Sequence, residues 1–363
     1  MTLFDRRLVR WFDAITLLTL AALLGIGMLL VASASAGEEL DLEKRQGAWV
    51  AVGILLTIVL GFLNYRHLTD NAYLLWGVCI AMLGLVLVLG PQISGARSWL
   101  RVGNIGIQPS ELAKVAIILA LARLFADREP RPFGLRGLAM PTVIVGIPFV
   151  LTALQPDQGT AITYLPILAA TAWAAGLQLR SVGILAGTTL AAAPLWYLSL
   201  HPYQRSRLTS FLAPEADPLG AGYQLVQSKI AVGSGGLFGK GLFSGTQSQL
   251  NFLPEQENDF IVALLGEEIG FFGVAAVLLL YLALILRLLR GAHVARDRAG
   301  AYICAGVAGL LTFHLAVNAG MVIGYLPITG IPLPLLSYGG SSALATCIAI
   351  GLVISVRSRR FLV

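Results

Sequence analysis

Long apolar runs recur along nearly the whole chain and are separated by short polar or charged segments. A helix of about 20 apolar residues is long enough to cross the roughly 30 Å hydrocarbon core of a bilayer. We predict ten such spans, at residues 14–34, 47–64, 73–90, 111–126, 140–155, 158–175, 181–200, 260–288, 300–323 and 335–356. The pattern therefore predicts an all-α, polytopic membrane protein in which residues 1–363 form a single transmembrane domain.

The composition agrees with a chain whose main solvent is lipid. Hydrophobic residues make up 57% and charged residues only 12% of the 363 residues, whereas a soluble domain carries roughly 25% charged residues. The net charge is +6, but no Lys/Arg-rich tract with interleaved aromatic residues indicates a nucleic-acid partner. The three Cys and four His residues are scattered, so their spacing predicts neither a disulfide framework nor a zinc site.

The basic residues are divided unevenly between the two sides of the predicted bundle. With the N-terminus placed in the cytoplasm, 16 of the 25 Lys and Arg residues fall in inner segments and 8 in outer segments, while Lys114 lies within a span. Cytoplasmic loops of membrane proteins carry an excess of Lys and Arg. We therefore expect both termini in the cytoplasm and an even number of spans.

Residues 201–259 form the longest segment between two predicted spans, and this segment lies on the outer side. Loops longer than about 15 residues are usually functional or disordered. Its large apolar residues include Leu225, Val226, Ile230, Leu237 and Phe238, which makes it too apolar for a disordered linker. We predict a large, partly structured outer loop that folds back onto the membrane, with a re-entrant or interfacial helix near 222–232.

Ionisable residues in or beside the spans are candidates for function, because charge within a membrane is costly. Glu111 and Lys114 are three residues apart, so a helix places them on one face, where they either serve the function or form a structural ion pair. Asp157 lies at an outer turn, as a functional acid or as the cap of the next helix. Glu267 and Glu268 point about 100° apart on a helix, and we expect structural roles for both.

Asp259 stands where the outer loop meets the span that begins at Phe260. Partial burial there would raise the pKa of its carboxyl group and make it a better base. The alternative is that Asp259 caps the helix, a position for which Asp is well suited. Glu255 and Glu257 come just before it and are further candidates.

The outer segments also carry cations beside glycine-rich stretches. Arg and Lys side chains together with mobile backbone amides suit an anionic headgroup such as a diphosphate. The alternatives are contact with anionic lipid and simple solvation. The candidate substrate-binding cations are Arg97, Arg101, Arg205, Arg207, Lys229 and Lys240, together with Lys114 within a span.

Four stretches resemble one known family, the SEDS proteins (shape, elongation, division and sporulation). They are residues Gly95–Lys114, Gln155–Ala161, Tyr203–Gly270 and Asn318–Ser342, which lie in the family's order and span most of the chain. Within the outer loop, the sequence GTQSQL resembles the elongation branch of the family. One departure is the pair Glu-Asn before Asp259, where the family commonly has His-Thr.

The resemblance implies a peptidoglycan glycosyltransferase of the bacterial cytoplasmic membrane that polymerises lipid II on the outer face during cell elongation. It also implies partners, namely a class B penicillin-binding protein and other elongation proteins. The family's essential acid falls on Asp259, and its other polar positions fall on Glu111, Lys114 and Asp157. The second carboxylate, Glu257, could raise the pKa of Asp259 or recruit a divalent cation, and the sequence indicates no other cofactor.

Two other functions remain open from the sequence. A lipid II flippase or other transporter would use Glu111 and Lys114 to line a path, although transporters often show repeated halves and none is visible. A non-enzymatic scaffold of the elongation machinery would tolerate neutral replacement of its charged outer residues.

Overall fold

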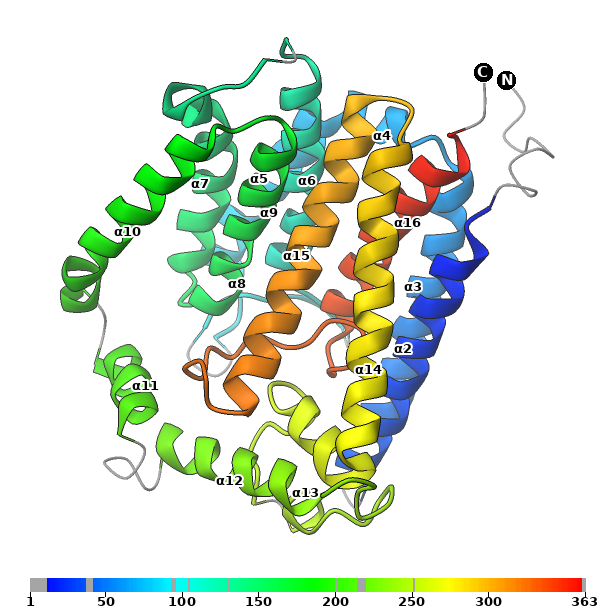
Figure 1. Ribbon diagram of the computed structural model, residues 1–363, viewed down its shortest axis with the longest axis vertical. Coiled ribbons are helices and arrows are strands. Elements are labelled where there is room, and N and C mark those ends of the chain that lie inside the picture. The colour runs from blue at the N-terminus through cyan, green and yellow to red at the C-terminus, as the bar shows by residue number, and fades with distance from the viewer. Residues whose placement is uncertain are drawn as a thin grey trace.

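The computed structural model describes residues 12–36, 42–92, 96–103, 105–129, 131–199, 202–213, 220–250 and 252–360. Across these ranges the fold is a helical bundle, with one small hairpin formed by β1 (Leu100–Val102) and β2 (Ile105–Ile107). Figure 1 shows that α2 begins and α16 ends at one end of the bundle, whereas α11, α12 and α13 lie at the opposite end. The long helices are α2 (Ala14–Ala34), α3 (Leu42–Phe62), α5 (Ala72–Leu89), α6 (Pro109–Ala126), α7 (Ala139–Ala153), α10 (Leu179–Ser199), α14 (Ile261–Val294), α15 (Arg298–Val322) and α16 (Gly340–Ser358).

The remaining elements are short and connect or cover the long ones. They are α4 (Tyr65–Asp70), the 3-10 helix η1 (Leu135–Leu138), α8 (Gln158–Ile162), α9 (Tyr164–Ala174), α11 (Pro202–Leu212), α12 (Ala221–Ser234) and α13 (Thr246–Gln249). The predicted loop helix near 222–232 is therefore confirmed as α12. Its Ser228 hydroxyl donates to the carbonyl of Val322 at 2.9 Å, which fixes α12 against the end of α15.

The prediction of an all-helical polytopic membrane protein is confirmed. Seven helical segments within the described ranges are long and apolar enough to cross a bilayer. The other three predicted spans correspond to α6, which carries three charged residues, to α8 and α9, which are separated at Thr163, and to α10, whose apolar part is shorter. Of these, α10 leans away from the rest of the bundle (Figure 1).

Helices α6, α15 and α16 are the most deeply buried and form the centre of the bundle. Small residues let α3 approach α16 closely, as expected where apolar burial alone does not favour helix association in lipid. A Cβ atom on Gly351 would lie 3.1 Å from the Thr57 backbone, and the Thr57 hydroxyl donates to the Cys347 carbonyl at 2.9 Å.

Three predicted boundaries were wrong by more than a helical turn, and one of them is the start of α3, at Leu42 rather than at 47. The last span begins at Gly340 rather than at 335, because residues 335–339 form a turn in which Leu335 has a φ of 74°. Helix α14 continues to Val294 rather than ending at 288. Charged residues follow the apolar run there, but they lie at the bundle end and do not interrupt the helix.

Helix α14 is broken at Gly270, where the backbone adopts φ 72° and ψ −167°. A break frees backbone groups that a membrane protein must satisfy internally. The glycine-rich stretch 233–241 does this, because the amides of Lys240 and Gly241 donate to the carbonyls of Glu267 and Glu268 at 3.0 and 2.9 Å. The amide of Phe271 in turn donates to the carbonyl of residue 236 at 2.9 Å.

Glycine is required at this junction by close packing of two backbones. A Cβ atom on Gly239 would lie 2.2 Å from the carbonyl oxygen of Glu268, and one on Gly270 would lie 2.3 Å from the amide nitrogen of Gly239. The expectation of mobile amides in this stretch was wrong for Lys240 and Gly241, since their amides are already bonded to α14.

The orientation of the bundle stays a prediction and can be tested with reporter fusions. Arg296 is exposed in the connection between α14 and α15, at the end of the bundle that holds most of the arginines. We expect an alkaline-phosphatase fusion at Arg296 to be inactive and one at Leu242, in the outer loop, to be active, because Lys and Arg are in excess in the cytoplasmic loops of membrane proteins. Activity of the Arg296 fusion would reverse the orientation.

Candidate active site

The first turns of α6 hold a buried ion pair. The Lys114 ammonium donates to the Glu111 carboxylate with Nζ and Oε1 2.7 Å apart, and both side chains are about 95% buried, at 4% and 5% exposure. The predicted pairing of these residues is confirmed. Across from it, His314 of α15 lies within electrostatic reach of Lys114, and its Nδ1 lies 2.9 Å from the carbonyl oxygen of Pro332.

Asp157 lies at the start of α8 and does cap that helix. Its Oδ1 accepts from the amide of Thr160 at 3.2 Å, and its Oδ2 accepts from Nε2 of Gln108 at 2.8 Å. The amide of Gln108 also donates to the hydroxyl of Ser341 at 3.1 Å, which connects the starts of α6, α8 and α16. Burial raises the pKa of Asp157, and the nearby charge of Glu111 adds to that effect, so this carboxyl keeps its proton to a higher pH than a free Asp.

Asp259 is held by hydrogen bonds on both sides of its backbone. Its amide donates to the carbonyl of Glu255 at 3.0 Å, and its carbonyl accepts from Nδ2 of Asn318 at 3.0 Å. The N-cap position of α14 belongs to Phe260, and no side-chain hydrogen bond caps the helix there. Asp259 lies one residue before this N-cap position, and the choice between a catalytic base and a helix cap stays a prediction.

The segment before Asp259 is also fixed in place. The carbonyl of Glu257 accepts from the amide of Tyr338 at 2.8 Å, and the Glu255 carboxylate accepts from Nδ2 of Asn258 at 2.8 Å. Glu255 has a φ of 53°, a backbone conformation that residues other than glycine rarely adopt. Strain of this kind persists only where the surroundings impose it, and it is common at functional sites.

The stretch 323–339, between α15 and α16, joins these positions into one polar cluster. Asn318 donates to the carbonyl of Ile331 at 3.0 Å as well as to that of Asp259. His314 lies one turn earlier on α15, with its Nδ1 beside the carbonyl oxygen of Pro332, and it interacts electrostatically with Lys114. Hydrogen bonds thus connect Asp259 with Asn318 and the 323–339 stretch, and electrostatic interactions relate His314 to Lys114 and Glu111 to Asp157.

Sequence reasoning missed His314 and Asn318, although a signal was present. Both are polar residues in an otherwise apolar span, and their spacing of four places them on the same helical face. Polar residues within spans are candidates for function by default. Gln108 and Ser341 lie at helix starts and carried no such signal.

The candidate cations are arranged in different ways. Arg97 and Arg101 are exposed beside and on β1, and Lys229 is exposed on α12. The Arg205 guanidinium lies 5.6 Å from the centre of the Tyr197 ring. Arg207 belongs to α11, but its side chain lies outside the described part of the structure.

Lys240 differs from the other cations because it is bound to a fully buried carboxylate. Its ammonium lies 2.8 Å from Oε1 of Glu267 and 2.7 Å from the hydroxyl of Thr246. Glu267 also accepts from the amides of Gln247 and Ser248 at 2.9 and 3.2 Å. Glu267 therefore has the structural role expected for it.

Neighbouring Glu268 has a structural role as well. Its carboxylate accepts from the hydroxyl of Ser33 on α2 at 2.5 Å, and the same hydroxyl accepts from the amide of Phe243 at 3.2 Å. Together, the two acids attach the outer loop to α14 and α2. Among the described residues, no group of three or more His, Cys, Asp or Glu side chains could hold a metal ion.

Comparison with known proteins identifies the family. The family model described as "Cell cycle protein", which covers FtsW, RodA and SpoVE, matches residues 14–361. This chain belongs to that family. Its members are the SEDS proteins, so the resemblance seen in the four sequence stretches is confirmed over nearly the whole chain.

Individual SEDS relatives agree with the elongation branch. The chain is 41% identical to "Peptidoglycan glycosyltransferase MrdB" of Escherichia coli K12, over 96% of this chain and 94% of the relative. It is 35% identical to "Peptidoglycan glycosyltransferase RodA" of Treponema pallidum, over 96% of this chain and 98% of the relative.

Two solved structures share the fold. One comes from work on a peptidoglycan synthase complex that coordinates polymerisation and crosslinking, with a TM-score of 0.82 and 36% identity over 97% of this chain and 99% of the other. The second is Thermus thermophilus RodA, with a TM-score of 0.73 and 31% identity over 97% of this chain and 98% of the other.

The Lys240–Glu267 pair predicts different effects for two outer lysines. We expect Lys240→Ala to lower the free energy of unfolding by roughly 2–3 kcal/mol, because it leaves a buried carboxylate without its counter-charge. Lys229→Ala removes the same charge from an exposed site and should change stability by less than about 0.5 kcal/mol. Denaturant unfolding in detergent measures both, and equal effects would contradict a structural role for Lys240.

Proposed function

We propose that this chain is a peptidoglycan glycosyltransferase that polymerises lipid II on the outer face of the bacterial cytoplasmic membrane during cell elongation. The enzyme class and the elongation role are those of the relatives, so the expectation of a glycosyltransferase is confirmed in preference to a transporter or a scaffold. The substrate, the catalytic residue and the orientation are the parts that we infer. The fixed position of Asp259 at the edge of the outer loop carries the proposal.

The proposed step is displacement at the anomeric carbon of a donor lipid II. The 4-hydroxyl of the acceptor sugar attacks C1 and gives its proton to the Asp259 carboxylate. The C1–O bond to the lipid-linked diphosphate breaks with its electron pair, and undecaprenyl diphosphate leaves. Attack from the opposite face converts the α-linked donor into a β-1,4 bond, so one carboxylate base suffices for an inverting transfer.

The setting of Asp259 supports its role as base. A general base must be held within hydrogen-bond reach of the proton it removes. The bonds to Glu255 and Asn318 fix the Asp259 backbone, while its side chain is half-buried rather than enclosed. A half-buried carboxylate can meet a sugar at the membrane surface and still be partly protected from water.

The buried residues of the cluster support substrate binding indirectly. The Glu111–Lys114 pair is 95% or more buried, so we infer that it positions α6 and the 323–339 stretch beneath Asp259. Asp157 acts in the same way, through Gln108 and Ser341. Glu255 and Glu257 both lie just before the base in the sequence. We infer that they contact the sugar rather than the diphosphate, because their negative charges would repel the diphosphate.

An apolar groove on α7 suits the lipid part of the substrate. It has a volume of about 400 Å³ and is lined by Val143, Gly146, Ile147, Val150 and Leu151. Three of these residues are large and face outward from the bundle, so a chain of isoprene units could lie along them.

Replacement of Asp259 by Asn tests the base directly. Asn has nearly the same shape but cannot accept a proton, so we expect polymerisation of lipid II by the purified protein to fall roughly 10²–10⁴-fold. Glu43→Gln is the control, because it removes an exposed carboxylate from the start of α3 on the same side of the bundle, away from the proposed site. Near-normal polymerisation by a folded Asp259→Asn protein would remove Asp259 from the mechanism and leave Glu257 as the next candidate.

The exposed arginines beside β1 test the diphosphate site. If Arg97 and Arg101 contact the diphosphate, each change to Ala should weaken use of lipid II by roughly 1.5–3 kcal/mol, the value for a hydrogen bond to a charged group. Arg45→Ala is the control, since Arg45 is exposed at the start of α3 on the same side. Equal kcat/KM values for all three variants and the parent would place the diphosphate elsewhere.

We also propose a stable complex with a single-pass class B penicillin-binding protein. The similar structure from a complex that couples polymerisation with crosslinking supports this partner. Many apolar side chains on the outer faces of the helices are exposed and available for such contact. Co-purification and crosslinking within membranes should recover the complex, and failure of both would remove the partner from the proposal.

A further inference from the structure

The stretch 323–339 contains a mostly buried Ile-Pro-Leu-Pro sequence at residues 331–334 that is neither helix nor strand. Backbone carbonyls that are removed from water need hydrogen-bond donors, and proline offers no amide to its neighbours. Three of these four carbonyls receive their hydrogen bonds from side chains of α14 and α15. The donors are Asn318, His314 and Tyr281, and they donate to the carbonyls of Ile331, Pro332 and Pro334, respectively.

Asn318 differs from the other two donors because it also holds the backbone of Asp259. Its side chain has no exposed surface, and its Nδ2 lies 3.0 Å from the carbonyl oxygen of Asp259 and 3.0 Å from that of Ile331. Both neighbours are carbonyl oxygens, which only accept, so the nitrogen end of the amide must face them. The two N–H bonds of one buried amide thus join Asp259 to the 323–339 stretch.

The oxygen of the same amide group is not satisfied. Oδ1 of Asn318 is buried, and it has no hydrogen-bond partner in the part of the chain that the structure describes. A buried polar atom without a partner costs free energy, and an apolar side chain of similar size would avoid that cost. The two donors are therefore the feature of Asn318 that this position uses.

A second hydrogen bond attaches the same segment two residues before Asp259. The amide of Tyr338, at the far end of the 323–339 stretch, donates to the carbonyl of Glu257 at 2.8 Å. A backbone that is held at residues 257 and 259 has little freedom to rotate between them. The direction of the Asp259 side chain therefore depends on both attachments.

We propose that Asn318 is a positioning residue for the sugar transfer and acts through Asp259. It contacts neither sugar, and its effect is to hold the backbone of the base in place while the acceptor hydroxyl gives up its proton. The inference rests on the proposed role of Asp259 as base. Displacement of a reacting group by about 1 Å can cost roughly 10²-fold in rate, so two hydrogen bonds from a rigid helix are enough to affect turnover.

The competing explanation is that Asn318 serves only the fold, by satisfying two buried carbonyls. A structural role would lower the rate by the same factor whatever residue stands at position 259. A positioning role has value only while a base is present there. A double-mutant cycle between Asn318 and Asp259 separates the two explanations, because it measures whether the two effects are independent.

The cycle uses the full chain, purified in detergent, with lipid II as substrate. Asn318→Leu keeps the size of the side chain and removes both donors, and it is made alone and together with Asp259→Asn. Asn318→Ser is made in parallel, because it is smaller and keeps one hydroxyl donor. Tyr281→Phe is the matched control, since it removes a buried donor to the carbonyl of Pro334 in the same stretch.

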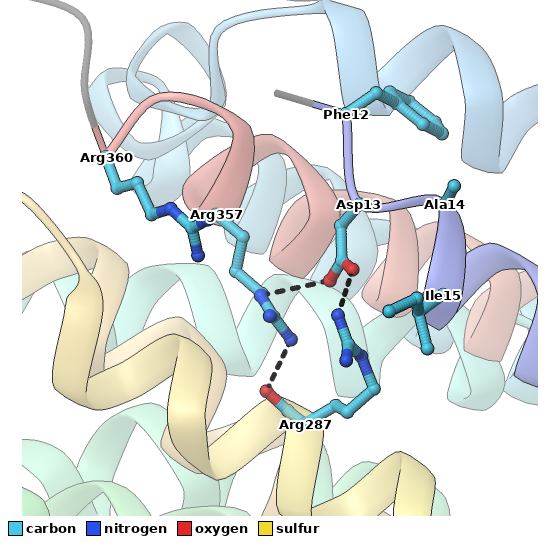
Figure 2. Close-up of a pocket in the computed structure, with 7 residues that line it drawn as sticks. All are labelled: Phe12, Asp13, Ala14, Ile15, Arg287, Arg357 and Arg360. Atoms are coloured by element: carbon cyan, nitrogen blue, oxygen red, sulfur yellow. Dashed lines mark hydrogen bonds and ion pairs between the residues drawn. The ribbon is translucent and has the colours of Figure 1, made fainter. Parts of the chain in front are cut away.

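A second control lies at the opposite end of the bundle. Figure 2 shows the Asp13 carboxylate between the guanidinium groups of Arg287 and Arg357, and its Oδ2 lies 3.0 Å from Nε of Arg357. These ion pairs join the start of α2 to α14 and α16. The variant Asp13→Asn therefore shows how far a loss of stability alone changes the rate.

We expect Asn318→Leu to lower kcat roughly 10–100-fold while KM for lipid II changes less than about threefold, because the loss affects the chemical step. In the Asp259→Asn protein, the same replacement should lower the remaining rate by less than about threefold. Asn318→Ser should show a smaller loss in the same direction. Tyr281→Phe and Asp13→Asn, measured well below their unfolding temperatures, should keep kcat within about threefold of the parent.

An equal loss from Asn318→Leu with and without the Asp259 carboxylate would overturn the positioning role and leave a structural one. A kcat for Asn318→Leu as high as that of Tyr281→Phe would overturn it as well. Near-normal polymerisation by Asp259→Asn alone is a different result, because it rejects the base and with it the proposed function. If the Leu protein does not fold, Asn318→Ser provides the same comparison in both backgrounds.

Discussion

The broken helix α14 and the buried carboxylate beside the break determine where the outer loop lies. At Gly270 the helix gives up backbone hydrogen bonds in a chain surrounded by lipid, and the glycine-rich stretch replaces them. Glu267, which has no exposed surface, then accepts from Lys240, Thr246 and two loop amides. These hydrogen bonds fix the loop against the bundle. Asp259 follows directly from that loop, so its position relative to the other helices depends on the same contacts.

Sequence periodicity predicted the parts of this structure that local spacing controls. The three-residue spacing of Glu111 and Lys114 implied a shared helical face, and they pair. The apolar content of the outer loop indicated a helix, and α12 lies there. The break at Gly270 could not be predicted in the same way, because the apolar residues continue without interruption from Ile269 to Leu286, past this glycine. Whether a glycine there continues or breaks a helix depends on the backbone of Gly239, which is far away in the sequence.

Contacts between distant residues could not be predicted from the sequence in the candidate site or at the opposite end of the bundle. Asn318 contacts the Asp259 carbonyl across 59 residues, and Asp13 meets Arg287 across 274. No periodicity encodes such pairs, since they depend on which helices become neighbours. The sequence does show which residues need a partner, because a polar or charged residue within an apolar span costs free energy. Lys114 and Glu111 satisfy that requirement by pairing within one helix, whereas Asp13 pairs with arginines of two other helices.

In the proposed mechanism, the reacting hydroxyl of lipid II lies against the carboxylate of Asp259, whose backbone is fixed by hydrogen bonds. The most direct measurement is a structure of the Asp259→Asn protein with lipid II bound, because loss of the base would preserve the substrate complex. We predict that the acceptor 4-hydroxyl lies about 2.6–3.2 Å from the side chain at position 259. We also predict that the diphosphate lies beside the arginines of the outer segments. Lipid II bound with no sugar hydroxyl near position 259 would contradict the account.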